Sequence, residues 1–263
     1  MSNKLSNKLD QELIRSQISP FYALVNVIAS TKSTNDDLKK NTLKYENATV
    51  LLSEKQTAGK GRNGRSFVSL DQKGIYCSIL LKPTFDPNLY LKLSILSGII
   101  LCETIRQHTG LVPTLKWPND VLIKGRKVAG ILCESSFQAG KQSSFIIGFG
   151  LNVYLQDFPK ELEDIATTLE DNCSRPLDRN TLTIEFLNRL ATYYPRLKQL
   201  SLEKMAAPYE LRTGTPITVH GPQTSYNALI EGIEDDGQLL IKVGDRTESL
   251  ISYEITIRED ETQ

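Results

Sequence analysis

The pattern of apolar and polar positions divides the chain into strands and helices. Runs rich in Val, Ile and Leu, bounded by turn residues, predict strands at 24–28, 48–54, 74–81, 121–123, 127–133 and 145–154. Apolar residues at helical spacing predict helices at 89–107 and 180–205, the second interrupted at Pro195. A further helix should begin at Ser33, because Asp36 stands three residues later in a capping arrangement. The main part of the chain therefore mixes both kinds of element.

The pattern changes beyond Pro208. Short strands separated by Gly, Asp and Asn turns are expected at 216–219, 228–233, 237–243 and 248–257, which predicts a small appended β-barrel. At the other end, a brief Ser-Asn-Lys-Leu repeat suggests a loose or partly helical arm. We therefore divide the chain into an arm at 1–19, a main domain at 20–207 and a small C-terminal domain at 208–263.

Charge and cysteine usage narrow the classes of function. The 263 residues include 31 basic and 31 acidic ones, so no overall field attracts a polyanion. The four cysteines lack C-x-x-C spacing and the two histidines are far apart, which argues against a zinc site or a disulfide framework. The sequence shows neither an apolar run long enough for a membrane span nor an apolar secretion signal. We expect a soluble, cytoplasmic protein.

The most distinctive stretch is 56–69, with the sequence QTAGKGRNGRSFVS. Glycines and cations alternate within it, at Gly59, Lys60, Gly61, Arg62, Gly64 and Arg65. Glycines allow positive φ while the guanidinium groups converge on a small volume, so the stretch predicts an anion cradle that is mobile when empty and orders over a phosphate or acyl phosphate. A dinucleotide fingerprint and a P-loop nearly fit, but both require a following helix, whereas strand residues follow from Phe67. A solvated basic turn is the alternative.

A second informative stretch contains a hairpin signal. Lys124-Gly125 stands between two β-branched runs, and Trp117-Pro118-Asn119-Asp120 forms a rigid corner at the entry. Lys127 follows the turn, where burial habits alone favour solvent exposure. Asn152 is the one polar group at the centre of a strand, so it either holds structure or meets a ligand.

Five motifs in order resemble the biotin protein ligase family. They are Ser33-Thr34-Asn35; Gln56-x-x-Gly59-Lys60-Gly61-Arg62-Asn63-Gly64-Arg65; Lys116-Trp117-Pro118-Asn119-Asp120; Lys127-x-Ala129-Gly130-Ile131; and Gly148-Phe149-Gly150-Leu151-Asn152-Val153. Each alone is weak, but five in order are specific. The resemblance runs from about residue 28 to the C-terminus. It implies an α+β fold in which helices flank a mixed β-sheet, as in class II aminoacyl-tRNA synthetases, followed by a small C-terminal SH3-like β-barrel.

The resemblance implies a reaction in two steps. The carboxylate of biotin attacks the α-phosphate of MgATP to give biotinyl-5′-adenylate and pyrophosphate, and a lysine of a biotin carboxyl carrier domain then takes the biotinyl group. The catalytic residues implied are Lys127, bridging the biotin carboxylate and the α-phosphate, and Arg62, near the phosphate. This role replaces the exposed-lysine expectation for Lys127.

Other site residues are carried over position by position. The biotin-binding residues implied are Ser33, Thr34, Asn35, Gln56, Gly59, Lys60, Gly61, Arg62 and Lys127. The ATP or adenylate residues implied are Arg62, Arg65, Phe67, Asn119, Asp120, Asn152 and Arg258, with Asp120 also a ligand of Mg²⁺. Lys60, Asn63 and Phe67 depart from residues common in the family. Phe67 can still cover the adenine, because an aromatic face suffices for stacking.

Two alternatives stay open, and the partner follows from the resemblance. A lipoate or octanoate protein ligase would share the fold and the adenylation chemistry. A nucleic-acid-binding module is more distant, because it needs an extended basic stripe. The ligase-like region begins near residue 28, so we expect a monofunctional ligase without a DNA-binding domain. The expected partner is a carrier domain, with neither nucleic acid nor membrane involved. A homodimer fits the family pattern, although no residue here indicates one.

Overall fold

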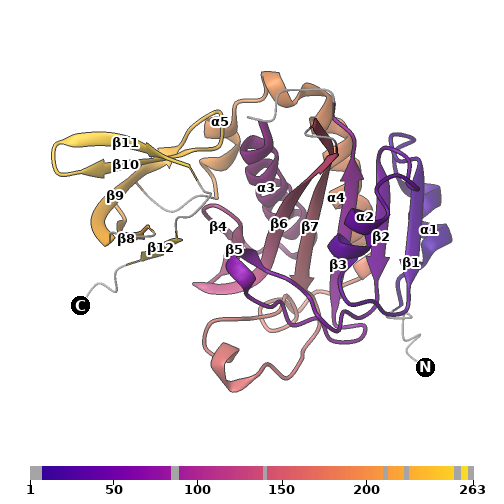
Figure 1. Cartoon of the computed structure of the whole chain (residues 1–263). Coiled ribbons are helices and arrows are strands. Elements are labelled where there is room, and N and C mark those ends of the chain that lie inside the picture. Colours follow the sequence, from indigo (N-terminus) through magenta and orange to yellow (C-terminus); the bar gives the residue numbers. More distant parts are fainter. Residues whose placement is uncertain are drawn as a thin grey trace.

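The structure is a computed structural model that describes residues 8–83, 89–138, 141–209, 213–221, 225–251 and 256–259. Within these ranges, seven strands form a mixed sheet at the centre of the larger part of the molecule (Figure 1). In chain order they are β1 (Leu24–Ile28), β2 (Thr49–Ser53), β3 (Gly74–Leu81), β4 (Thr114–Lys116), β5 (Asp120–Ile123), β6 (Arg126–Gln138) and β7 (Lys141–Asn152). Their order in the sheet is β1-β2-β3-β7-β6-β5-β4, with β1 and β2 parallel and the other neighbours antiparallel. The predicted mixed sheet is confirmed.

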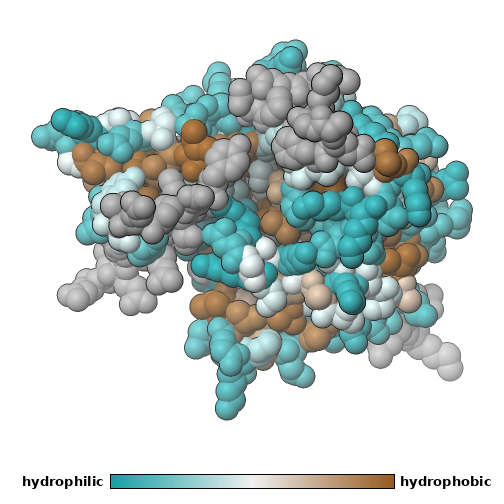
Figure 2. Space-filling view, in the orientation of Figure 1, coloured by the Kyte–Doolittle hydropathy of each residue, from teal (hydrophilic) through white to brown (hydrophobic). Residues whose placement is uncertain are grey.

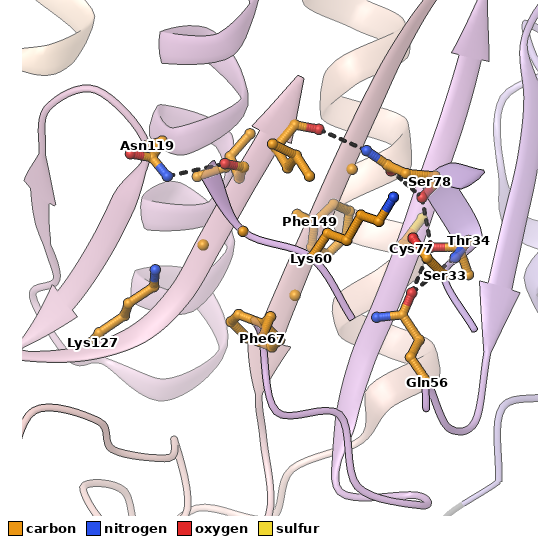
Figure 3. Close-up of a pocket in the computed structure, with 17 residues that line it drawn as sticks. Ser33, Thr34, Gln56, Lys60, Phe67, Cys77, Ser78, Asn119, Lys127 and Phe149 are labelled. Carbon is orange, nitrogen blue, oxygen red and sulfur yellow. Dashed lines mark hydrogen bonds between the residues drawn. The ribbon is translucent and has the colours of Figure 1, made fainter. Parts of the chain in front are cut away.

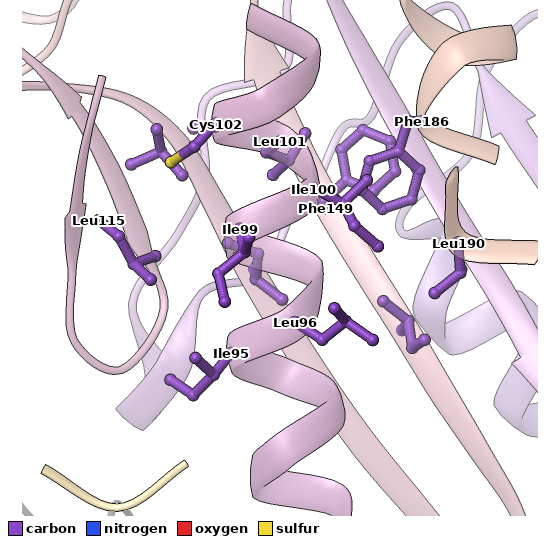
Figure 4. Close-up of a cluster of buried hydrophobic side chains, with 14 of the residues drawn as sticks. Ile95, Leu96, Ile99, Ile100, Leu101, Cys102, Leu115, Phe149, Phe186 and Leu190 are labelled. Carbon is purple, nitrogen blue, oxygen red and sulfur yellow. The ribbon is translucent and has the colours of Figure 1, made fainter. Parts of the chain in front are cut away.

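Helices cover both faces of this sheet. They are α1 (Gln11–Gln17), α2 (Thr34–Lys40), α3 (Leu89–Thr109), α4 (Arg179–Tyr193) and α5 (Leu202–Ala206). Helices α3 and α4 bury their apolar sides against one face and form the main core (Figure 4). On the other face, Leu38 of α2 packs in a smaller cluster with Leu51. Along β2, Leu51 belongs to that cluster while Val50 and Leu52 belong to the main core, because successive strand side chains point to opposite faces.

A second, smaller sheet lies beside the large one (Figure 1). Its strands β8 (Pro216–His220), β9 (Ser225–Ile233), β10 (Leu239–Val243), β11 (Arg246–Leu250) and β12 (Thr256–Glu259) follow the order β11-β10-β9-β8-β12. Trp117 Nε1 donates to Gly237 O at 2.9 Å, which ties the β9–β10 turn to the large sheet. Hydrophobic residues gather over this small sheet on the face shown in Figure 2. The predicted small β unit at the C-terminus is therefore present.

The structure refines several predicted boundaries. The stretch expected as one strand at 248–257 contains parts of β11 and β12. The predicted break at Pro195 is confirmed, since α4 ends at Tyr193 and a 3-10 segment, Tyr194–Gln199, follows. The strand expected from Phe67 begins only at Gly74. None of the helices in the described ranges has the length and apolar character needed to cross a bilayer.

The described part of the N-terminal arm is a docked helix rather than a loose segment. Asp10 caps α1 by accepting a hydrogen bond from Leu13 N at 3.0 Å. Ile14 is fully buried in the main core. Gln11 Oε1 accepts from Val27 N at 2.9 Å, so α1 also satisfies a backbone donor on the edge strand β1.

Candidate active site

Two adjoining cavities lie between the cationic loop (residues 55–73) and the large sheet. The smaller one is lined from α2, the loop, β3, β6 and β7, and includes Ser33, Thr34, Asn35, Gln56, Lys60, Gly61, Cys77 and Ser78 (Figure 3). The larger one, of about 580 Å³, includes Arg62, Arg65, Lys116, Asp120 and Asn152. Four residues line both cavities: Gly61, Phe67, Asn119 and Lys127. The five sequence motifs therefore meet at one place.

Neutral hydrogen-bonding groups form the polar end of the smaller cavity (Figure 3). Gln56 Oε1 accepts from Thr34 N at 2.9 Å and from Thr34 Oγ1 at 3.1 Å. Thr34 Oγ1 also lies 2.6 Å from Ser78 Oγ. Ser33 caps α2, with its side chain accepting from Asp36 N at 3.4 Å. The predicted helix cap at Ser33 is confirmed, and it places Ser33 and Thr34 at the cavity wall.

Asn35 is fixed by contacts within the protein. Its Nδ2 donates to Leu132 O at 3.1 Å and to Glu134 Oε2 at 2.9 Å, and its Oδ1 accepts from Ser78 Oγ at 2.6 Å. A Cβ at Gly148 would lie 2.1 Å from Asn35 Oδ1, so only glycine leaves room for this amide. Both Asn35 donors are occupied, which leaves the second lone pair of Oδ1 for any ligand.

The cationic loop folds back on itself as a short hairpin. Phe67 N donates to Gly59 O at 2.9 Å and Gly61 N donates to Arg65 O at 2.7 Å. Of its three glycines Gly64 alone uses the freedom to adopt a positive φ, with a φ of 73°. Gly59 is required for another reason, because a Cβ there would lie 2.4 Å from Phe67 O.

The cations Lys60, Arg62 and Arg65 of the loop divide between the two cavities. Lys60 forms an ion pair of 2.7 Å with Asp36 at the start of α2, and this hydrogen bond raises the pKa of Lys60. Arg62 Nη1 donates to Asn119 Oδ1 at 3.4 Å, and Arg62 and Arg65 line the larger cavity. Burial lowers the pKa of Arg62 while the carboxylate of Asp120 acts against this. The two guanidinium groups therefore line one cavity, whereas Lys60 lines the other.

Lys127 lies in the wall between the two cavities. Its Nζ forms an ion pair of 2.7 Å with Asp120 Oδ1 and lies 6.0 Å from the centroid of the Phe67 ring. The side chain is 34% exposed, so the expectation from burial habits of an exposed lysine is wrong. The hairpin predicted at Lys124-Gly125 is confirmed, with both residues at positive φ, and it places Lys127 one residue into β6.

Asn152 and Arg258 complete the predicted nucleotide residues. Asn152 Nδ2 donates to Thr167 O at 3.1 Å, while its buried Oδ1 has no hydrogen-bond partner among the described residues. An unpaired buried acceptor beside a cavity favours a ligand that supplies a donor or a cation. Arg258 belongs to β12, and its side chain lies outside what the structure describes. No group of three or more His, Cys, Asp or Glu in the described ranges could hold a metal ion by itself.

The apolar wall of the larger cavity was missed in the sequence. It consists of Phe158, Leu162, Ile165 and Ala166, from the segment that follows β7. Ile165 is 58% exposed, which is unusual for a large apolar side chain. The spacing of these four residues, at i, i+4, i+7 and i+8, was the available signal, although it is typical of a helix and the structure forms only a 3-10 segment there, Lys160–Leu162.

Comparisons with known proteins agree with this geometry. The chain matches the biotin/lipoate A/B protein ligase family over residues 26–152. The bifunctional ligase/repressor BirA of Bacillus subtilis is 30% identical over 238 residues, which cover 88% of this chain and 72% of that protein. The biotin--[acetyl-CoA-carboxylase] ligase of Mycobacterium tuberculosis is 30% identical over 258 residues, covering 93% and 94%. A biotin protein ligase from Aquifex aeolicus, solved in complex with biotin and ATP, matches with a TM-score of 0.79 and 27% identity, covering 91% of this chain and 100% of that one.

Proposed function

The chain belongs to the biotin/lipoate A/B protein ligase family, and we propose that it activates biotin with ATP and transfers the biotinyl group to a lysine of a biotin carboxyl carrier domain. The family predicted from the five motifs is thereby confirmed. The observation that carries the activity is the shared wall of the two cavities, where Lys127 and Phe67 lie between a polar pocket and a larger cation-lined one. Such a wall is where an acid and a nucleotide would be brought together.

The smaller cavity suits the ring system of biotin. A urea offers two donors and one acceptor, and Ser33, Thr34 and Gln56 present neutral groups of both kinds. A lipoyl ring has no such groups, so it would form none of the hydrogen bonds that a urea can form with these side chains. Asn35 would hold Ser78 and Glu134 in place more than it contacts the ligand. The polar end of the cavity therefore favours biotin over lipoate or octanoate.

The larger cavity suits ATP and the adenylate. Arg62 and Arg65 would neutralise the phosphates, and Phe67 would cover the adenine beside Asn119. Arg258 is carried over from the resemblance alone. In the first step a carboxylate oxygen of biotin bonds to the α-phosphorus and pyrophosphate leaves. In the second, a lysine nitrogen of the carrier bonds to the acyl carbon and AMP leaves.

Lys127 is placed to screen both anions in the first step. Two negative groups repel each other on approach, and a fixed cation between them lowers the energy of the transition state more than that of the separate substrates. Its partner Asp120 keeps the ammonium at the wall until the substrates arrive. Lys60 lines the smaller cavity together with Lys127, and its ion pair with Asp36 holds this part of the loop against α2.

Mg²⁺ is an expected companion of ATP, and the residues here fit it. The carboxylate of Asp120 and the unpartnered Oδ1 of Asn152 are hard oxygen donors lining the same cavity. Mg²⁺ commonly takes one or two protein oxygens and completes its shell with water and phosphate. When bound, the ion would neutralise charge on the leaving pyrophosphate.

The decisive experiment uses the full chain with biotin, MgATP and a carrier domain. We expect biotin-dependent exchange of pyrophosphate into ATP and a biotinyl mass increment on the carrier lysine. Equal or faster modification with lipoate would show that the substrate assignment is wrong. Absence of exchange in folded protein would refute the activity itself. A cytoplasmic location follows from the need for ATP and carrier, and analytical centrifugation with and without biotin would test the homodimer.

A further inference from the structure

A buried arginine lies outside both cavities. Arg179, the first residue of α4, is 1% exposed and is the largest fully buried side chain among the described residues. A buried guanidinium is unfavourable unless its donors are matched by acceptors. Its Nη2 donates to Glu54 Oε2 at 2.7 Å, and its Nη1 donates to Gly74 O at 2.9 Å. The proposed reaction makes no use of this group.

These two acceptors stand at the two ends of the cationic loop. Glu54 directly follows β2, and Gly74 is the first residue of β3. Gln72 N donates to Glu54 O at 3.0 Å, which forms a further rung across the base of the loop. The other carboxylate oxygen of Glu54 accepts from Leu9 N at 2.7 Å. One guanidinium therefore joins the strand that enters the loop to the strand that leaves it.

The loop has to move for a ligand to enter. The smaller cavity holds only about 40 Å³, whereas small-molecule sites commonly measure about 300–1,000 Å³. Its cover includes Lys60, Gly61 and Phe67, all from the loop. Gln56, which faces the ligand, lies two residues beyond Glu54 and donates its backbone N–H to Ser69 O at 3.2 Å. A fixed base lets the tip open while Gln56 keeps its position.

We propose that Arg179 is a positioning residue of the ligase, acting by fixing both ends of the cationic loop so that the loop closes with Gln56 and Phe67 in place. The inference deepens the proposed function and rests on it for its kinetic part only. Arginine is suited to the task because its planar fork reaches two acceptors at once, which a lysine ammonium at this distance does not. We call the hydrogen bonds from Arg179 to Glu54 and Gly74 the clamp. Without the clamp, the two ends of the loop should move over a wider range.

The test compares variants of Arg179 and its partner Glu54 with a control variant on α4, all in the full-length protein. Glu54→Leu with Arg179→Met removes both charges together, because a buried pair replaced by apolar groups often keeps stability, whereas removing one partner alone does not. Arg179→Lys is the second variant and keeps the charge. The matched control is Arg189→Met, also on α4, which breaks an ion pair of 2.7 Å to Glu103 on α3 and one of 2.6 Å to Glu185 within α4.

The first readout needs no ligand and no activity. Trypsin can cut the loop after Lys60, Arg62 and Arg65, and mass spectrometry reports each cut. We expect cleavage to be about tenfold faster in both Arg179 variants, corresponding to about 1.4 kcal/mol of easier opening. The control Arg189→Met should be cut at the wild-type rate even if it melts earlier. Wild-type cleavage in either folded Arg179 variant would overturn the clamp.

The second readout is kinetic. We expect kcat/KM for adenylate formation to fall by about a hundredfold in the Arg179 variants, because small misplacements of contact groups have effects of this size. The double variant should stay folded but melt somewhat earlier, because Leu9 N and Gly74 O lose their side-chain partners. Normal kinetics with a loose loop would also overturn the positioning role. If wild-type protein forms no adenylate, the proposed function fails, while the cleavage comparison still decides whether the clamp exists.

Discussion

Replacing Lys127 by methionine separates catalysis from stability. Methionine keeps most of the length of the side chain but removes the charge. The lost ion pair with Asp120 is 2.7 Å long, with side chains 34% and 27% exposed. Partly exposed pairs contribute about 0–1 kcal/mol. For a chain of this size, about 1 kcal/mol corresponds to roughly 2–4 °C of melting temperature.

The expected effect on the reaction is much larger. A preorganised donor that meets charge developing in the transition state contributes about 2.7–4 kcal/mol, or a factor of 10²–10³ in rate. Lys127 would meet two anions at once, so the first step should slow by at least about a hundredfold. Biotin-dependent exchange of pyrophosphate into ATP measures that step alone, and thermal unfolding of the same sample measures stability.

Lys39→Met is the matched control for this measurement. Lys39 forms an ion pair of 2.8 Å with Glu134, with side chains 43% and 21% exposed, and it lines neither cavity. It should lose a similar small stability and keep exchange within about threefold of wild type. Exchange by Lys127→Met within tenfold of wild type would refute the catalytic assignment. A stability loss above about 3 kcal/mol, as for a broken buried pair, would assign Lys127 a structural role instead.

Three further outcomes test separate parts of the site. Gly150→Ala should keep the fold but displace the Phe67 ring, because the added Cβ would lie 2.4 Å from Phe67 Cε1. Pyrophosphate exchange should slow by about tenfold. An unchanged exchange rate would mean that the position of Phe67 does not matter for adenylate formation. Thr34→Val should raise the KM for biotin by about tenfold, or 1.4 kcal/mol, and leave the KM for ATP unchanged, because it removes the hydroxyl shared with Gln56 and Ser78; equal changes in both constants would contradict a pocket-specific role. Burial raises the pKa of Cys133 to about 12 and raises the pKa of Cys77 and Cys102 well above the ordinary value, so these three thiols stay protonated at pH 9. Iodoacetamide should therefore modify them only after unfolding, which mass spectrometry can follow. Rapid modification in the folded state would show that these sites open locally.

The local parts of the site could be predicted from the sequence because short-range chemistry determines them. The cap at Ser33 and the turn at Lys124-Gly125 depend on neighbouring residues alone. The division of the loop cations was not predictable in this way. Lys60 is held by Asp36, which is 24 residues away, and nothing in the spacing of the loop reveals that partner. Long-range pairing, rather than composition, decides which cavity each cation serves.

Arg179 shows the same limit more strongly. In the sequence it is one of several charged residues on an amphipathic helix, where solvent exposure is the usual outcome. Its partner Glu54 lies 125 residues earlier, and only the packing of α4 against the start of β3 brings them together. Charged residues that serve a buried contact between distant elements have no local signature, so sequence motifs alone omit them.

Glycines on adjacent strands explain why the two cavities share a wall. Gly130 of β6 pairs with Gly150 of β7, and Gly148 lies on the same face two residues away. A Cβ at Gly130 would lie 2.9 Å from Lys127 Nζ, and one at Gly150 would collide with Phe67. Because these glycines have no side chains, Lys127 and the Phe67 ring can pack directly against the strands between the two cavities. The glycines of the fourth and fifth motifs therefore contribute by lacking side chains, which leaves room for Lys127 and Phe67 between the cavities.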